Sequence, residues 1–286
     1  MTELLQLAPT GEQVKPMFRP DGAVQYDQRI LTWKGRDAVS ILTLTGRIIV
    51  PVRYQDRWTK VPGTVVRGQA DLTVRDGKWY LAVVIDVPEP PGREPSGWLG
   101  VDLGVVNLAV DSDGTVHTGT TVRAMRRRNH RLRARLQAKA TKSAMRLLKK
   151  RRRKEARHAR DVNHCISKKL VRTAKGTGRG IKLEDLRGIR ARITVNKAQR
   201  SDLHSWAFYQ LRQFVGYKAA IAGVPVVLVG PRNTSRECHE CGHIDKRNRR
   251  TRDEFLCLRC GHAGPADHNA ARNIARRAAV MQPNAA

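Results

Sequence analysis

Asp102 is the first residue in this chain whose position suggests chemistry. It lies in the stretch 97–107 (GWLGVDLGVVN). Read as a strand with a period of two, this stretch has leucine and valine on one face and Asp102 between two glycines on the other. A lone acid on an apolar strand is unfavourable to bury unless a metal or a partner compensates its charge, and glycine neighbours let a ligand approach the backbone. The alternative is an exposed acid on an edge strand.

Two further acids occupy comparable positions later in the chain. Glu184 ends the predicted strand 180–186, and Asp267 opens the predicted helix 266–275 on the face that packs inward. Each has an ordinary explanation, since many strands end in acids and the helix dipole favours an acid in the first turn. Gathered in one cleft, however, the three carboxylates would supply the oxygen ligands that two Mg²⁺ ions about 4 Å apart need for phosphodiester hydrolysis.

Four of the five cysteines form two Cys-x-x-Cys pairs, Cys238 with Cys241 and Cys257 with Cys260. Fifteen residues separate the pairs, which is the spacing of a zinc ribbon. Four thiolates leave no open position on the metal, so we expect one structural Zn²⁺ and treat the nearby histidines as bystanders. The fifth cysteine, Cys165, falls in a helical pattern and is expected to be a small buried side chain.

The charge of the chain points to a polyanionic partner. Its 286 residues include 55 Lys and Arg against 25 Asp and Glu, a net charge of +30. Nucleic acid is the leading candidate and an anionic membrane a distant second. The sequence has no signal peptide and no run of about 18 apolar residues, so we expect a cytoplasmic protein without a membrane partner. When bound to DNA, it is expected to associate with the bacterial nucleoid.

The strongest concentration of positive charge is the segment 126–160, which carries 17 Lys or Arg and a single acid, Glu155. The segment contains neither Pro nor Gly, and its apolar residues recur at helical intervals. We therefore predict long basic helices over 122–173. A charge run is usually a solvated face, but so dense a block of one sign favours phosphate backbone contacts. The residues predicted to make them are Arg126, Arg127, Arg128, Lys149, Lys150, Arg151, Arg152, Arg153 and Lys154.

The chain divides by composition into successive parts. Short alternating strands and an Asp-Gly turn predict a small antiparallel β module over 26–87, and a proline-rich stretch marks a linker over 88–97. The predicted boundaries are a poorly ordered N-terminus 1–25, the β module, the linker, a main α/β domain made of 98–231 and 263–280, the zinc ribbon 232–262, and a tail 281–286.

Three motifs together resemble those of a RuvC-like nuclease with the RNase H fold. They are 100–104 (GVDLG), 182–186 (KLEDL) and 267–274 (DHNAARNI). A cysteine-pair insertion directly before the third motif resembles the transposon-encoded TnpB family, which is related to the type V CRISPR effector nucleases. The resemblance covers about residues 26–280. It implies an α/β fold: an RNase H-like (RuvC) domain with an inserted zinc ribbon, preceded by a small antiparallel wedge-like β module.

The resemblance also implies an activity. Asp102, Glu184 and Asp267 would bind two catalytic Mg²⁺ ions, and the chain would be an RNA-guided DNA endonuclease. The guide RNA would come from the transposon end, and cleavage of matched double-stranded DNA would occur beside a short flanking motif. The basic helices would lie against the guide or the guide–target heteroduplex.

The N-terminus departs from the family pattern, because members usually begin with a helical recognition region that is not evident here. Three explanations stay open: a truncated product, a minimal form, or a protein that works with a second subunit or a larger RNA. Two other functions also stay open. One is a guide-RNA-dependent DNA-binding regulator or transposition accessory protein without autonomous cleavage. The other is a non-catalytic zinc-ribbon RNA-binding protein, in which the three acidic motifs would be coincidental.

Overall fold

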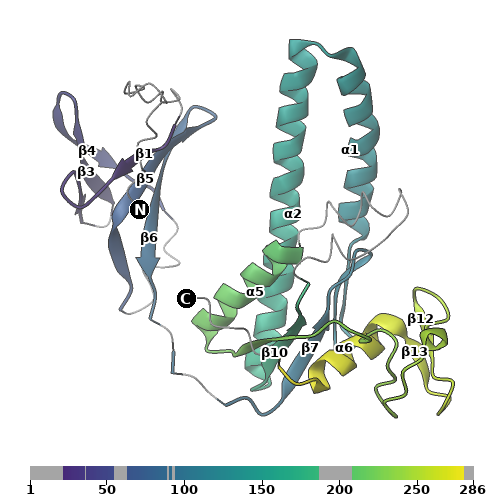
Figure 1. The fold of residues 1–286 in the computed structure, drawn as a ribbon. Coiled ribbons are helices and arrows are strands. Elements are labelled where there is room, and N and C mark those ends of the chain that lie inside the picture. Colours follow the sequence, from purple (N-terminus) through teal and green to yellow (C-terminus); the bar gives the residue numbers. More distant parts are fainter. Residues whose placement is uncertain are drawn as a thin grey trace, which may run out of the picture. The chain divides into compact units, whose positions relative to one another are not determined.

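The computed structural model describes residues 22–35, 37–54, 63–88, 90–91, 94–186 and 208–279. The chain divides into two compact units, 1–88 and 89–286, whose folds Figure 1 shows. The predicted N-terminal segment lies outside the described residues up to position 21, whereas Val24 and Gln25 already belong to a strand. The predicted tail 281–286 also lies outside them. None of the described helices is long and apolar enough to cross a membrane.

The first unit is built from two three-stranded antiparallel sheets. One contains β1 (Val24–Tyr26), β5 (Val65–Arg75) and β6 (Lys78–Asp86), and the other contains β2 (Leu31–Lys34), β3 (Ala38–Thr43) and β4 (Gly46–Pro51). Asp76 and Gly77 both have positive φ, as a two-residue hairpin turn requires. The core consists of Tyr26, Leu31, Val39, Ile41 and Ala70. The predicted antiparallel strands are therefore present.

The second unit is organised around a mixed five-stranded sheet in the order β11-β10-β7-β8-β9. Its strands are β7 (Trp98–Asp102), β8 (Asn107–Asp111), β9 (Val116–Thr118), β10 (Gly180–Glu184) and β11 (Val226–Val229). β10 runs parallel to both β7 and β11, whereas β7, β8 and β9 pair antiparallel. β7, β8 and β9 thus form three antiparallel strands in succession.

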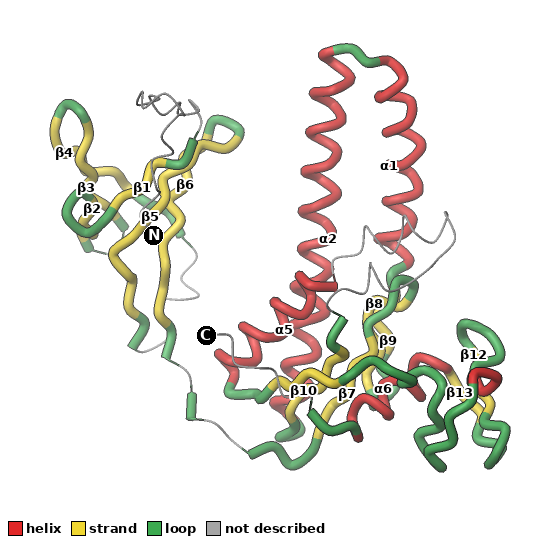
Figure 2. Tube along the Cα trace, in the orientation of Figure 1, coloured by secondary structure: helices red, strands yellow, loops and turns green. Residues whose placement is uncertain are grey.

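Helices cover both faces of this sheet. Leu99, Val101, Ile181 and Leu183 are fully buried in a core formed with α2 (Lys142–Gly176) and α5 (Phe208–Ala222). The opposite face of β7 packs against α6 (Ala266–Arg276). Figure 2 shows α5 and α6 beside the strands of this unit. Apolar side chains at alternate positions of β7 and β10 thus form one face of the sheet. Gly100, Asp102 and Glu184 lie on the other face.

The basic segment forms a helical hairpin. α1 (Thr120–Lys139) and α2 are joined by Ala140, in the left-handed conformation with φ 48°, and Thr141, whose hydroxyl caps α2 by accepting from the Ala144 N–H. Between the helices, the Glu155 carboxylate accepts from Asn129 Nδ2 at 3.1 Å and from Arg133 Nη2 at 3.2 Å. The one acid of this block therefore joins the two helices, and the predicted long basic helices are present.

One sequence expectation needs correction. Cys165, expected to be buried, is exposed on α2. The zinc-ribbon segment contains η1 (Lys246–Asn248) and β12 (Glu254–Leu256), and β12 pairs with β13 (Ala263–Pro265). β13, which follows the predicted ribbon boundary at residue 262, thus pairs with a strand of the ribbon segment. Its apolar centre includes Phe255, which is 2% exposed.

Gly100 gives α6 its close approach to β7, and it makes a first testable prediction. A Cβ at this position would lie 2.1 Å from the Ala271 carbonyl oxygen and 2.4 Å from the Ala275 nitrogen. Both are backbone atoms, so the helix itself would have to move. The glycine thus makes room for α6, and not for a ligand as the strand pattern suggested. We expect Gly100→Ala to lower the free energy of unfolding in urea by about 3 kcal/mol.

Gly216 provides the matched control, because it lies within α5 and a Cβ there would meet nothing within 4 Å. Gly216→Ala should raise the free energy of unfolding by about 0.5–1 kcal/mol, since alanine is the better helix former. Equal stabilities of the two variants would show that α6 does not lie against Gly100.

Candidate functional site

Asp102 and Glu184 stand side by side at the ends of two parallel strands. The register pairs Val101 of β7 with Leu183 of β10, so the next residue along each strand is one of the two acids. Both carboxylates belong to the face that α6 covers. The carboxyl ends of adjacent parallel strands at one sheet edge are a usual place for a ligand site in α/β folds. The sequence identified both acids, and the parallel register brings them together.

Asp267 approaches the same place from the first turn of α6. Its Oδ2 accepts from Asn107 Nδ2 at 2.9 Å, and its Oδ1 lies 3.4 Å from Arg249 Nη2. Asn107 begins β8, and Arg249 comes from the zinc-ribbon segment between the cysteine pairs. The sequence pattern assigns no role to either residue. The structure thus brings together three predicted acids and adds an amide and a guanidinium beside them.

The electrostatics of this cluster favour a cation. Burial, together with the carboxylates of Glu184 and Asp267, raises the pKa of Asp102 well above its usual range, and Arg249 opposes the rise. Burial also raises the pKa of Glu184, and it outweighs a hydrogen bond from Thr234 and the charge of Arg277. Glu184 is 7% exposed, and its buried Oε1 has no hydrogen-bond partner. Because a buried, unpartnered carboxylate oxygen is costly, the donor set fits hard divalent cations.

In the described part of the chain, two groups of side chains have ligand atoms that all lie within 4.8 Å of one another, and the three acids form neither of them.

The four cysteines form one of these two convergent groups, as the spacing predicted. The Sγ atoms of Cys238 and Cys260 are 3.7 Å apart, and those of Cys241 and Cys257 are 3.5 Å apart. These separations are far longer than a disulfide bond and match the edge of about 3.8 Å that four Zn–S bonds of 2.3 Å give in a tetrahedron. The geometry fits a structural zinc ion with four thiolate ligands.

His239, Glu240 and His262 form the second convergent group, beside the cysteines. The Arg272 guanidinium lies 2.7 Å from His239 Nε2, and a fixed cation at that atom disfavours a metal ion there. His239 Nδ1 lies 3.0 Å from the Asn269 side-chain oxygen. These contacts make His239 part of the junction between the ribbon and α6.

Asn269 and Asn273 hold the zinc ribbon onto α6. Asn269 accepts from the His239 N–H at 3.1 Å and donates to the Glu237 carbonyl at 2.8 Å. Asn273 donates to the carbonyls of Thr234 at 2.9 Å and Glu237 at 2.7 Å. Both asparagines are almost fully buried. Two asparagines four residues apart lie on one face of a helix, and this spacing was the signal that the sequence offered for them.

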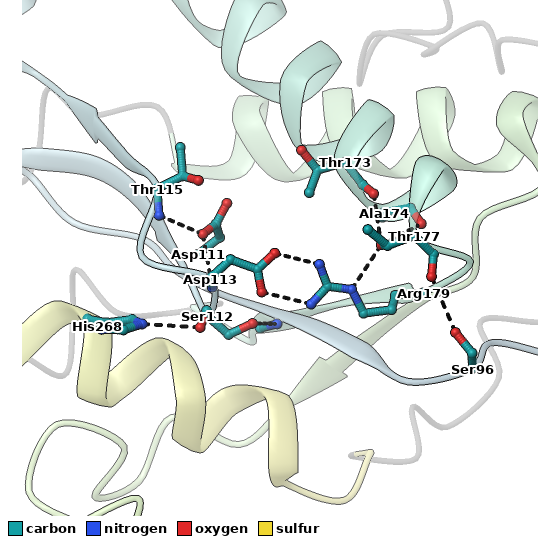
Figure 3. A network of polar contacts seen from close by, with 11 residues as sticks. Ser96, Asp111, Ser112, Asp113, Thr115, Thr173, Ala174, Thr177, Arg179 and His268 are labelled. Carbon is teal, nitrogen blue, oxygen red and sulfur yellow. Dashed lines mark hydrogen bonds and ion pairs between the residues drawn. The ribbon is translucent and has the colours of Figure 1, made fainter.

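A polar network lies at the N-terminal ends of β7 and β10, away from the acids at their C-terminal ends, as Figure 3 shows. Arg179, just before β10, makes two parallel hydrogen bonds to Asp113 in the β8–β9 turn, at 2.8 and 2.5 Å. This pairing lowers the pKa of Asp113 and raises that of Arg179. His268 Nε2 donates to the Ser112 carbonyl at 3.1 Å. The turn is thereby tied to both the α2–β10 connection and the first turn of α6, next to Asp267.

The predicted phosphate-contacting residues lie on the α1–α2 hairpin. All of them except the partly buried Arg126 are exposed. The hairpin therefore presents a dense positive surface, formed by Arg126, Arg127, Arg128, Lys149, Lys150, Arg151, Arg152, Arg153 and Lys154.

Comparison with known proteins supports a family assignment. The family described as "Probable transposase" (OrfB_IS605) matches residues 82–187, which include β7 and β10. The family described as "Cas12f1-like, TNB domain" matches residues 208–274, from α5 to α6.

Individual relatives agree with these two family matches. The "CRISPR-associated endodeoxyribonuclease Cas12f1" of Sulfoacidibacillus thermotolerans is 34% identical over 220 residues, which is 70% of this chain and 50% of that protein. The "TnpB-like protein MJ0751" of Methanocaldococcus jannaschii is 32% identical over 154 residues, covering 50% of this chain and 55% of that protein. The chain thus spans about half the length of the curated relatives it matches.

The fold has counterparts among solved structures. A Cas12f1–sgRNA–target DNA complex superposes with a TM-score of 0.51 and 19% identity, covering 72% of this chain and 55% of that one. This likeness shows a shared mixed α/β fold. Together with the two family matches and the relatives above, it completes the assignment. The chain therefore belongs to the TnpB family of transposon-encoded proteins, which is related to the Cas12f endodeoxyribonucleases.

Proposed function

We propose that this chain is an RNA-guided DNA endonuclease that cleaves guide-matched double-stranded DNA beside a short flanking motif by two-metal hydrolysis. The observation that carries the proposal is the buried, unpartnered Glu184 oxygen beside Asp102, whose pKa is also raised by the charge of Asp267. The names of the relatives support the choice of DNA as the substrate and RNA as the guide.

In this proposal the mixed sheet and its helices form an RNase H-like (RuvC) domain. Asp102, Glu184 and Asp267 would hold two Mg²⁺ ions, which would supply activation of the attacking water and stabilisation of the leaving oxygen. Asn107 orients the Asp267 carboxylate through its 2.9 Å hydrogen bond. The zinc-ribbon segment carries Arg249, whose guanidinium lies beside Asp267. In this proposal the same guanidinium would hold the scissile phosphate.

The other parts serve binding. The α1–α2 hairpin contacts the phosphate backbone of the guide or of its heteroduplex with the target, because its exposed cations recognise charge and shape rather than sequence. The antiparallel β unit is proposed to act as a wedge-like module.

The test is reconstitution. The chain is expressed with its own flanking transposon DNA, the co-purifying RNA is sequenced, and the complex is incubated with a guide-matched plasmid library with and without Mg²⁺. We expect cuts that require Mg²⁺ and fall beside one short motif. A defined bound RNA with stable target binding but no cuts would instead identify a guided DNA-binding protein.

Arg249 provides a sharper prediction about the site. Arg249→Ala should slow single-turnover cleavage about 100-fold, because one preorganised charged donor to the reacting phosphate is lost. Target DNA binding, measured separately by filter retention, should change less than about threefold, since many other cations contact the backbone. Arg250→Ala is the matched control, because Arg250 is the exposed neighbour in the same segment. Equal rates for the two variants would remove Arg249 from the site.

A further inference from the structure

Lys182 is a buried lysine two residues before Glu184 on β10. It is 7% exposed, and its ammonium lies 4.8 Å from the centre of the Trp98 ring. Among the described residues, no carboxylate lies within ion-pair distance of it. A lysine is rarely buried without a carboxylate partner, so the groups that compensate this charge need to be identified.

The compensating groups are carbonyls at the end of α6. Lys182 Nζ donates to the Ala275 carbonyl at 3.0 Å and to the Arg277 carbonyl at 2.6 Å. The last carbonyls of a helix have no partner within the helix and carry the negative end of its dipole. Lys182 therefore caps the C-terminal end of α6 from the neighbouring strand.

Lys182 acts together with the glycine beside it. The register pairs Lys182 with Gly100 of β7, and the missing Cβ of Gly100 admits the backbone of α6 at Ala271 and Ala275. Gly100 thus sets how closely α6 approaches the sheet, whereas the two directional hydrogen bonds of Lys182 set its position along the helix axis. The ribbon contacts of Asn269 and Asn273 fix α6 to the ribbon rather than to β10.

The far end of the same helix carries Asp267. A helix is stiff and rises about 1.5 Å per residue, so Ala275 and Asp267 are about 12 Å apart and move together along its axis. Metal-binding carboxylates must be held within about 0.5 Å of their productive positions. An axial shift at the Lys182 end would therefore move Asp267 away from Asp102 and Glu184.

We propose that Lys182 is a positioning residue for the nuclease site: by anchoring the last turn of α6 to the strand that carries Glu184, it sets the distance of Asp267 from the other two acids. The inference rests on the proposed two-metal function. It assigns Lys182 no contact with substrate or metal, and its influence on the site passes through α6.

The test compares Lys182→Met, which keeps the aliphatic chain and removes the donors, with Lys182→Arg, which keeps a charged donor. Lys175→Met is the matched control, since Lys175 is an exposed lysine in the last turn of α2. Mn²⁺ binding to the RNA-loaded full chain without DNA is measured by electron paramagnetic resonance. Hydrogen exchange of the peptide covering α6 and the Mg²⁺ dependence of cleavage are measured in parallel.

We expect Lys182→Met to weaken Mn²⁺ binding about tenfold, to raise the Mg²⁺ concentration for half-maximal cleavage by a similar factor, and to speed exchange in α6. Cleavage at saturating Mg²⁺ should stay within about threefold of the unchanged protein, because all three acids remain. Lys182→Arg should fall between, and Lys175→Met should match the unchanged protein.

Unchanged Mn²⁺ affinity in Lys182→Met, with or without a lower melting temperature, would overturn the proposal and leave Lys182 a stabilising residue. If Lys182→Met does not fold, Lys182→Arg decides: a Mn²⁺ affinity lowered by less than about tenfold together with faster α6 exchange supports positioning, and faster α6 exchange with unaltered Mn²⁺ affinity overturns it. If the unchanged protein binds no Mn²⁺, the two-metal function fails, and with it the role of Lys182 in that site. The exchange data would then report separately on the cap itself.

Discussion

Asp102→Asn is expected to abolish cleavage and, at the same time, to stabilise the metal-free protein. Cleavage should fall by about 10³-fold or more, because an amide supplies neither the charge nor the second oxygen that a divalent ion needs, and several kcal/mol of charge stabilisation disappear. RNA binding should persist, since Asp102 lies at the end of β7 and not on the basic hairpin. The measurement is the cleavage rate of guide-matched DNA at saturating Mg²⁺.

The stability effect has the opposite sign. Burial and two neighbouring carboxylates raise the pKa of Asp102, which means that its charged form is unfavourable in the folded protein without metal. Asparagine has nearly the same shape and no charge. The melting temperature without metal should therefore rise by about 2–5 °C. In the exposed control Asp86→Asn, both cleavage and melting temperature should stay near their original values. Loss of activity together with a lower melting temperature would indicate a folding role for Asp102 instead.

Cys257→Ala is the second change with a large expected effect. It removes one of four converging thiolates, and three ligands should hold zinc too weakly for the ribbon to stay folded. Zinc measured by mass spectrometry should fall from one ion per chain to nearly none. Limited trypsin digestion should then cut within the ribbon, which contains several arginines between the cysteine pairs.

Cleavage should also fall, by about 100-fold, because folding of the ribbon places Arg249 beside Asp267 and gives Asn269 and Asn273 their partners. Cys165→Ala is the matched control: its thiol is exposed on α2, outside the cluster, so zinc content and cleavage should not change. Full zinc content and trypsin resistance in Cys257→Ala would show that Cys257 is not a ligand.

Local sequence patterns determined a large part of this protein. The period of two places Asp102 and Glu184 opposite the apolar faces of their strands, and this holds whatever the neighbouring strands are. The two Cys-x-x-Cys pairs predict a zinc site because each knuckle is a local turn, and the four sulfurs do converge. The basic hairpin follows from helical periodicity without Pro or Gly.

Only the tertiary structure decided how these parts act on one another. The parallel register of β7 and β10 makes neighbours of acids 82 positions apart in the chain, and no local pattern specifies that register. Asn107 and Arg249 meet Asp267 because separate elements converge on the first turn of α6. The strand pattern alone suggests room for a ligand at Gly100 and gives Lys182 no role, whereas the packing of α6 over both residues gives each a contact with that helix. Residue type and period determine which face a side chain takes, whereas the partner it meets there depends on long-range packing, which the local sequence does not encode.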